Sequence, residues 1–230
     1  MYQFDKIYEF VRGPLALSSF IIFFAGIAWQ IVMFFSHTKK LEGTRITGPR
    51  PTRKEIERYA PSEEIRRLAR WEGTVFRMDP CFAILTSIFH IILILTPIFL
   101  LAHNILIEQS WGVAPPSFAE RFSDILTIVI LAFGAFFLYR RLFVPKVRAI
   151  TTGGDYILFL LVFVPYLTGF LAYHQFFAYK KMIIIHMLTG ELMLVCIPFT
   201  RLKHMIFYFL NRFFVRGEYN FFKIGNRVWN

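Results

Sequence analysis

The sequence predicts an all-α integral membrane protein, a bundle of five helices. Hydrophobic residues make up 56% of the 230 residues, and several apolar runs approach the ~20 residues that a helix needs to cross the hydrocarbon core. These runs are continuous rather than alternating, which favours helices over a closed barrel, the other structure that satisfies the backbone in lipid. We expect a single membrane domain over residues 1–230.

The apolar runs give five expected spans, taken in chain order. Residues 15–36 follow a mixed-charge start and lack a small-residue cleavage site, so this span is expected to be retained and not cut as a signal peptide. Residues 81–107 contain Pro97, which predicts a bend. The remaining spans are residues 122–144, 156–178 and 182–214, the last continuing helically to its end. Neither an inverted repeat nor a broken helix is apparent.

Basic residues are distributed unevenly between the expected loops. If the N-terminus lies outside, the inner segments 37–80, 140–155 and 201–230 hold 21 of the 26 Lys and Arg residues, and the outer segments hold 5. Because Lys and Arg favour the cytoplasmic side, we expect the N-terminus in the periplasm and the C-terminus in the cytoplasm. The net charge of +11 then follows from topology and implies lipid contact, with no need for nucleic acid.

The expected cytoplasmic loop, residues 37–80, holds a short amphipathic pattern, PSEEIRRLARWEGTVF. Ser62 suits the N-cap, and Ile65 and Leu68 supply apolar contacts on one face. This helix is expected either to lie on the membrane surface or to dock a partner subunit.

Histidines occur where ionisable residues are costly, and each is therefore a functional hypothesis. His90 and His103 lie on the second expected span, and His186 and His204 lie on the fifth. The two spans run antiparallel, so His103 is expected near His186 towards the outside, and His90 near His204 towards the inside. Two such pairs could ligate two b-type haems, since bis-imidazole iron has no open position for oxygen. The alternative is structural histidines bonded to neighbouring helices.

The helical spacing of these histidines differs between the two spans. His186 and His204 are eighteen residues apart, five whole turns, which predicts one shared face. His90 and His103 are thirteen apart, about 140° around an ideal helix, so a bend at Pro97 would have to re-aim them. Two cysteines, Cys81 and Cys196, and the absence of CxxCH give no indication of an iron–sulfur cluster, a zinc site or covalent haem.

Three strings carry a resemblance to a known family: SIFHIILILTPIFLLAHNILIEQSWGV, TGFLAYHQF and HMLTGELMLVCIPFTRLKH. With the five-span layout they resemble the gamma subunit of respiratory nitrate reductase, a diheme cytochrome b. They resemble more closely the short membrane cytochrome b subunits of sulfate-reducing bacteria, in the high-molecular-weight cytochrome c complex and complexes of the Dsr type. The resemblance implies that His103 and His186 ligate the outer haem, and His90 and His204 the inner one.

The resemblance also implies a function, cofactors and partners. A diheme subunit of a respiratory oxidoreductase complex would pass electrons between the periplasmic side or the menaquinone pool and a cytoplasmic iron–sulfur subunit. That subunit would be of the heterodisulfide reductase type, and other membrane subunits and a periplasmic cytochrome c would be further partners. The expected location is the cytoplasmic (inner) membrane of a bacterium or archaeon, in anaerobic respiration. Catalysis of its own is expected only if quinone reacts at the outer haem.

Two polar features complete the candidate residues. His174 ends the fourth expected span, with Tyr173 and Lys180 nearby in sequence. It is expected to bond a quinone carbonyl or take a proton from quinol, to be an interfacial histidine, or to replace His103 as a ligand. Glu191 lies about 7.5 Å deeper than His186, where it could relay protons, bond a haem propionate or bond a neighbouring helix.

A haem-free protein is the rival class. In it the chain would be a transporter-like or purely structural membrane subunit, and the same intramembrane histidines would bind protons or a metal ion.

Overall fold

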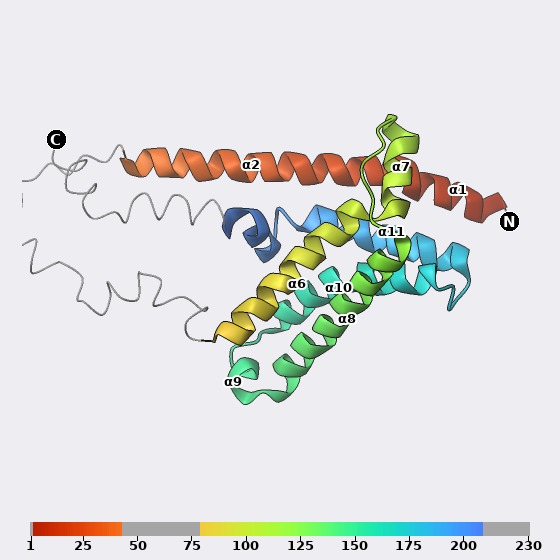
Figure 1. Cartoon of the computed structure of the whole chain (residues 1–230). Helices are drawn as coiled ribbons and strands as arrows, with labels where there is room; N and C mark the ends of the chain where they lie inside the picture. Colours follow the sequence, from red (N-terminus) through yellow and green to blue (C-terminus); the bar gives the residue numbers. More distant parts are fainter. Residues whose placement is uncertain (1, 43–78, 209–230) are drawn as a thin grey trace, which may run out of the picture. The chain divides into compact units, whose positions relative to one another are not determined.

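The computed structural model of the chain describes residues 2–42 and 79–208, and within these ranges every regular element is helical. The chain divides into two compact units, Met1–Tyr59 with Ile184–Asn230, and Ala60–Ile183. Figure 1 shows the described helices of both units, coloured along the sequence. The expected amphipathic helix of the loop 37–80 and the end of the fifth span after residue 208 lie outside the described residues.

Four helical stretches of the described residues are long and apolar enough to cross a membrane: Asp5–Ser36, Pro80–Phe99, Glu120–Phe143 and Gly153–Tyr173. A fifth span is formed if the bent pair Tyr179–Cys196 and Arg201–Tyr208 is counted as one. The all-α fold and the multi-pass membrane character are therefore confirmed. The sides on which the two termini lie stay a prediction.

Three long helices form the body of the second unit. They are α6 (Pro80–Phe99), α8 (Glu120–Phe143) and α10 (Gly153–Tyr173), to which the shorter α7 (Leu101–Trp111) and α9 (Pro145–Arg148) are joined. Helix α8 packs against both α6 and α10, and the three alternate in direction (Figure 1). As a result the start of α8 and the end of α10 lie at the same end of this unit.

Local sequence signals set where these helices begin. The Asp79 carboxylate accepts a hydrogen bond from the Phe82 amide at 3.0 Å, and Pro80 occupies the first turn of α6, where its missing N–H costs nothing. At the start of α10, Asp155 reaches back to the Thr152 amide at 2.8 Å as half of a capping box. Both caps satisfy amides that the helix itself cannot pair.

An aromatic cluster fills the space between these helices. The Phe89 ring stacks on Phe163 at 5.8 Å and meets the edges of Phe133 and Phe137 at 5.7 and 5.1 Å. Gly134 makes this possible, because a Cβ atom at that position would collide with the Phe163 ring. A small residue on one membrane helix thus admits a large ring from the next, as is common where helices pack in lipid.

The second expected span was predicted as one continuous helix, but the structure has two helices there. Helix α6 ends at Phe99, Leu100 is extended (φ −71°, ψ 123°), and α7 begins at Leu101. Pro97 has no N–H to donate to the Leu93 carbonyl, which instead accepts a hydrogen bond from the Tyr166 hydroxyl at 2.5 Å. The expected bend exists, but it is a break three residues after the proline.

The first unit opens with a nearly continuous helix. It consists of α1 (Tyr2–Phe10), the π-helical turn η1 (Val11–Leu15) and α2 (Ala16–Glu42). Pro14 lies inside the π-helical turn, where a proline is tolerated because the turn already departs from the regular hydrogen-bond ladder. The expected first span, residues 15–36, is contained in this helix.

The prediction of one continuous fifth helix is wrong. Helix α11 (Tyr179–Cys196) stops, η3 (Arg201–Lys203) follows, and the axis turns by 76° between the two helical pieces. Pro198 cannot donate to the Leu194 carbonyl and so ends the ladder. His186 and His204 therefore do not share one face of one helix, as five whole turns had predicted.

Residues of α2 support this break. The side-chain amide of Gln30 donates to the Pro198 carbonyl at 3.1 Å, and Lys203 Nζ donates to Gln30 Oε1 at 3.4 Å. One turn earlier, a Cβ atom on Gly26 would lie only 2.7 Å from Pro198 Cγ. Glycine at this position therefore lets α2 approach the broken segment closely.

Tyr166→Phe tests the bond that satisfies the Leu93 carbonyl. Loss of the hydroxyl leaves that carbonyl unpaired in an apolar helix, and we expect a loss of about 1 kcal/mol of unfolding free energy. Tyr139→Phe is the matched control, because the Tyr139 side chain is exposed. Thermal unfolding of both variants in the same detergent measures the difference. Equal midpoints would contradict this role of Tyr166.

Candidate functional site

The four predicted haem ligands lie on different elements. His90 is on α6 and His103 on α7, in the second unit, whereas His186 is on α11 and His204 directly follows η3, in the first. Each predicted pair takes one histidine from each unit. The pairing therefore stays a prediction from sequence spacing and helix direction.

Three of these histidines share one hydrogen-bond pattern. Nδ1 lies 2.6 Å from the Thr86 carbonyl in His90, 2.9 Å from the Pro97 carbonyl in His103 and 2.8 Å from the Arg201 carbonyl in His204. Because a carbonyl can only accept, Nδ1 carries the proton in each neutral ring, and the lone pair resides on Nε2. Fixing the ring through Nδ1 and a backbone carbonyl is typical of histidines that ligate a metal through Nε2.

The break after α6 sets the direction of His103. In an uninterrupted helix the Pro97 carbonyl would accept from the amide four residues later, but the chain is extended at Leu100. The carbonyl accepts from the His103 ring instead. The histidine is thus oriented by the same irregularity that separates its helix from that of His90.

The middle of α11 has features that suit a large flat ligand. No heavy atom of the described residues outside the local helix backbone lies within 4 Å of where a Gly190 Cβ atom would be. The next residue, Glu191, is buried, and its Oε2 has no hydrogen-bond partner within the described ranges. Open space beside a helix and an unsatisfied carboxyl oxygen near His186 fit a porphyrin with polar substituents.

A haem site would need few ligands from the protein. Among the described residues no group of three or more His, Cys, Asp or Glu side chains could hold a metal ion by itself. A b-type haem needs only two axial side chains, because the porphyrin supplies four nitrogens. His90, His103, His186 and His204 are the residues predicted to hold haem, and their pairing across the two units stays a prediction.

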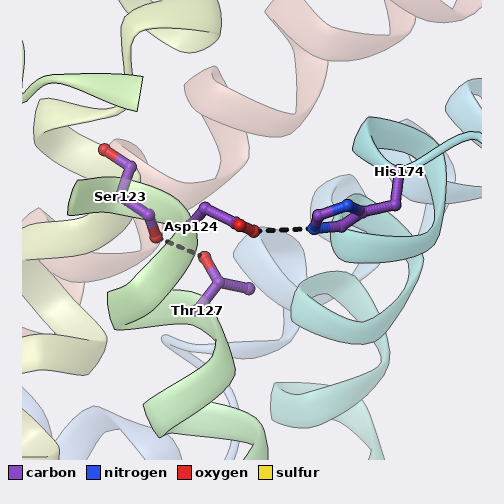
Figure 2. Close-up of polar contacts among 4 residues, drawn as sticks. All are labelled: Ser123, Asp124, Thr127 and His174. Atoms are coloured by element: carbon purple, nitrogen blue, oxygen red, sulfur yellow. Dashed lines mark hydrogen bonds and ion pairs between the residues drawn. The ribbon is translucent and has the colours of Figure 1, made fainter. Parts of the chain in front are cut away.

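His174 lies in a second polar site, at the end of α10. The helix ends at Tyr173, and Gln175 has the left-handed conformation (φ 53°) that turns the chain away. His174 Nε2 lies 2.9 Å from Asp124 Oδ1 of α8 (Figure 2). The predicted quinone-site residue Tyr173 meets the His174 ring edge-on at 5.0 Å. Lys180, the third predicted residue, is the second residue of α11.

Sequence reasoning missed three residues that contact these segments. Asp124 pairs with His174 across fifty residues of sequence, Tyr166 bonds Leu93, and Gln30 bonds Pro198. Gln30 is an isolated polar residue in an apolar run, a signal that the sequence offered. Asp124 follows Ser123 at the start of its apolar run, where a polar residue gives no such signal. Tyr166 carried no such signal, since tyrosine is common in membrane helices.

A comparison with known proteins finds a relative that matches most of the length of the chain. The chain is similar to a curated protein of Nitratidesulfovibrio vulgaris, with 29% identity over 210 residues that cover 90% of each chain. That relative is named only "Protein", which states no function. No protein-family model and no solved structure matches the chain.

Proposed function

We propose that this chain is a diheme cytochrome b, a membrane subunit of a respiratory oxidoreductase complex. It passes electrons between the periplasmic side or the menaquinone pool and a cytoplasmic iron–sulfur subunit. The observation that carries the proposal is the common anchoring of His90, His103 and His204, each with Nδ1 on a backbone carbonyl. That arrangement prepares Nε2 of three independent rings for iron.

The ligand assignment follows depth in the bilayer. His103 and His186 hold the haem nearer the outside, and His90 and His204 the haem nearer the inside. Each bound haem supplies one-electron chemistry. The protein's contribution would be two histidine ligands for each iron, which would leave no open position for oxygen and would restrict the iron to electron transfer.

The proposed partners and location follow from the expected orientation of the chain in the membrane. With the N-terminus in the periplasm of a bacterial or archaeal cell, the loop 37–80 and the C-terminal segment face the cytoplasm. Their basic charge favours an acidic surface on a heterodisulfide reductase-like iron–sulfur subunit, and also anionic lipid. A periplasmic cytochrome c and further membrane subunits would complete the complex.

A quinone site at the outer end of the bundle belongs to this proposal. Supporting it, His174 lies among the rings of Tyr173 and Phe170, at 5.0 and 4.4 Å. Aromatic and imidazole side chains suit a flat ring with polar oxygens. Tyr173, His174 and Lys180 are the proposed contacts of menaquinone.

The broken fifth span favours a second candidate function. A helix interrupted at mid-course, here by a 76° turn, is a feature of transporters, whose exposed backbone groups bind ions. In that case the chain would be a haem-free, transporter-like membrane subunit with protonated or metal-bound histidines. The two candidates differ in whether the purified protein carries haem.

A reduced-minus-oxidised visible spectrum, with haem quantified per chain, tests the proposal. We expect a b-type signal from two haems. Replacing His186 or His204 separately by Ala should each lower the haem content by about half, because each removes one axial ligand. His37→Ala, at a histidine without a proposed ligand role, is the matched control and should keep both haems.

Two outcomes would contradict different parts of this proposal. A haem-saturated preparation without a b-type signal would favour the transporter-like candidate. Retention of both haems in the His186 and His204 variants would refute the ligand assignment while leaving the cytochrome intact.

Gly190→Leu tests whether a porphyrin occupies the open space beside α11. A Cβ atom added at this position would have no described neighbour within 4 Å, so we expect the apoprotein to fold normally, while the leucine would occupy the volume proposed for the haem. We expect lower haem content with an unchanged unfolding midpoint of the apoprotein. Gly153→Leu is the control, because the space beside Gly153 is also open. Full haem content in Gly190→Leu would place the porphyrin elsewhere.

A further inference from the structure

A hydrogen bond between a histidine and an aspartate joins two helices of the second unit at the same end as the proposed quinone site. His174 Nε2 lies 2.9 Å from Asp124 Oδ1 (Figure 2). Asp124 belongs to the second turn of α8, where the Thr127 hydroxyl also donates to the Ser123 carbonyl at 2.9 Å. His174 caps the end of α10. Two helices that pack against each other thus carry the carboxylate and the imidazole.

The hydrogen bond fixes which ring nitrogen can accept a proton. A carboxylate accepts, so in the neutral ring Nε2 carries the proton, and the lone pair is on Nδ1. In the described part of the chain no hydrogen bond reaches Nδ1. This is the reverse of the three proposed haem ligands, in which Nδ1 carries the proton. The hydrogen bonding of His174 therefore suits proton transfer at Nδ1, and not the haem-ligand arrangement.

The surroundings make the pair accessible to an apolar ring. The side chains of His174 and Asp124 are 32% and 23% exposed. The rings of Phe170, Tyr173 and Phe176 lie 4.4, 5.0 and 5.9 Å from the imidazole. The carboxylate also holds the imidazole in one orientation through Nε2, so that Nδ1 is the ring nitrogen that can accept a proton.

We infer that Asp124 is a positioning residue for His174, which accepts the protons released when a hydroquinone is oxidised at the outer end of the bundle. This inference rests on the proposed function, whose two ferric haems would be the oxidant. One hydroxyl O–H bond breaks and its proton moves to Nδ1, while the electron would go to a ferric haem. After His174 passes this proton to the outer solution, the second hydroxyl gives its proton in the same way, and its electron would go to the second ferric haem. The products would be one quinone, two ferrous haems and two protons.

A purely structural contact is the competing explanation, and Asp124→Asn separates the two. The Asn amide can accept a hydrogen bond from Nε2–H through its oxygen or donate one to Nε2 through its NH2 group, so the link between α8 and α10 is retained. The negative charge is lost, and the contact no longer requires the Nε2–H form of the ring. Glu120→Gln is the matched control, because it removes an exposed carboxylate from the first turn of the same helix. Both variants are made in the full chain.

The first readout is independent of haem and of activity. Nitrogen-15 NMR of labelled histidine in the detergent-solubilised protein, assigned with His174→Gln, reports which ring nitrogen carries the proton. We expect the Nε2–H form of His174 in the wild type and in Glu120→Gln, and a mixture of both forms in Asp124→Asn. A His174 signal unchanged by Asp124→Asn would overturn the inference.

The second readout is the rate of haem reduction by a soluble hydroquinone, followed in the visible spectrum. At saturating hydroquinone we expect Asp124→Asn to slow reduction by about tenfold or more. Its half-saturating concentration, its haem content and its reduction by dithionite should match those of Glu120→Gln. Equal rates in the two variants would overturn the inference while both haems still demonstrate the proposed function.

A double variant covers the case in which Asp124→Asn impairs folding. If Asp124 acts only through His174, then Asp124→Asn added to His174→Gln should cause no further loss of rate. If the fold losses in rate of the two single variants multiply in the double variant, the two residues act independently, which would overturn the inference. A wild-type preparation without a b-type signal would instead refute the proposed function, and this inference with it.

Discussion

The structure depends on one constraint: a backbone carbonyl released inside an apolar helix must find another donor, because lipid offers none. Pro97 leaves the Leu93 carbonyl without its helical donor near the end of α6, and the break after α11 leaves the Pro198 carbonyl outside a regular helix. The Tyr166 hydroxyl bonds Leu93, and the Gln30 side chain bonds the Pro198 carbonyl. Where α6 stops, the Phe118 amide donates to the Phe99 carbonyl at 2.8 Å. The breaks are therefore stabilised positions and not random distortions.

The same constraint orients the histidines. His103 donates to the Pro97 carbonyl that the break after α6 leaves without its helical partner, and His204 donates to Arg201 in the turn that follows the break after α11. An imidazole that satisfies a released carbonyl through Nδ1 presents Nε2 for coordination. The two breaks near proline thus leave backbone carbonyls that need a donor, and the donors are two of the histidines that we propose as haem ligands. His174, which bonds a carboxylate through Nε2, has the opposite arrangement.

Much of the helical layout could be predicted from the sequence, because apolar length and charge bias act locally. The start of α8 was expected within two residues, and the bend near Pro97 followed from its missing N–H. The break after α11 was not predicted, although Pro198 lies in that segment. The spacing of His186 and His204 by five whole turns had favoured one continuous helix. Whether a proline bends or ends a helix depends on donors such as Gln30, which is 168 residues distant. Asp124 was missed for the same reason, since its partner is known only once α8 and α10 pack.

Low-temperature electron paramagnetic resonance of the oxidised, purified chain tests the central claim most directly. The account predicts low-spin ferric signals from two haems, because imidazole Nε2 atoms fill both axial positions of each iron. A predominantly high-spin ferric signal would mean an open axial position and would contradict the bis-histidine account. Absence of any haem iron signal from a haem-saturated preparation would contradict it entirely.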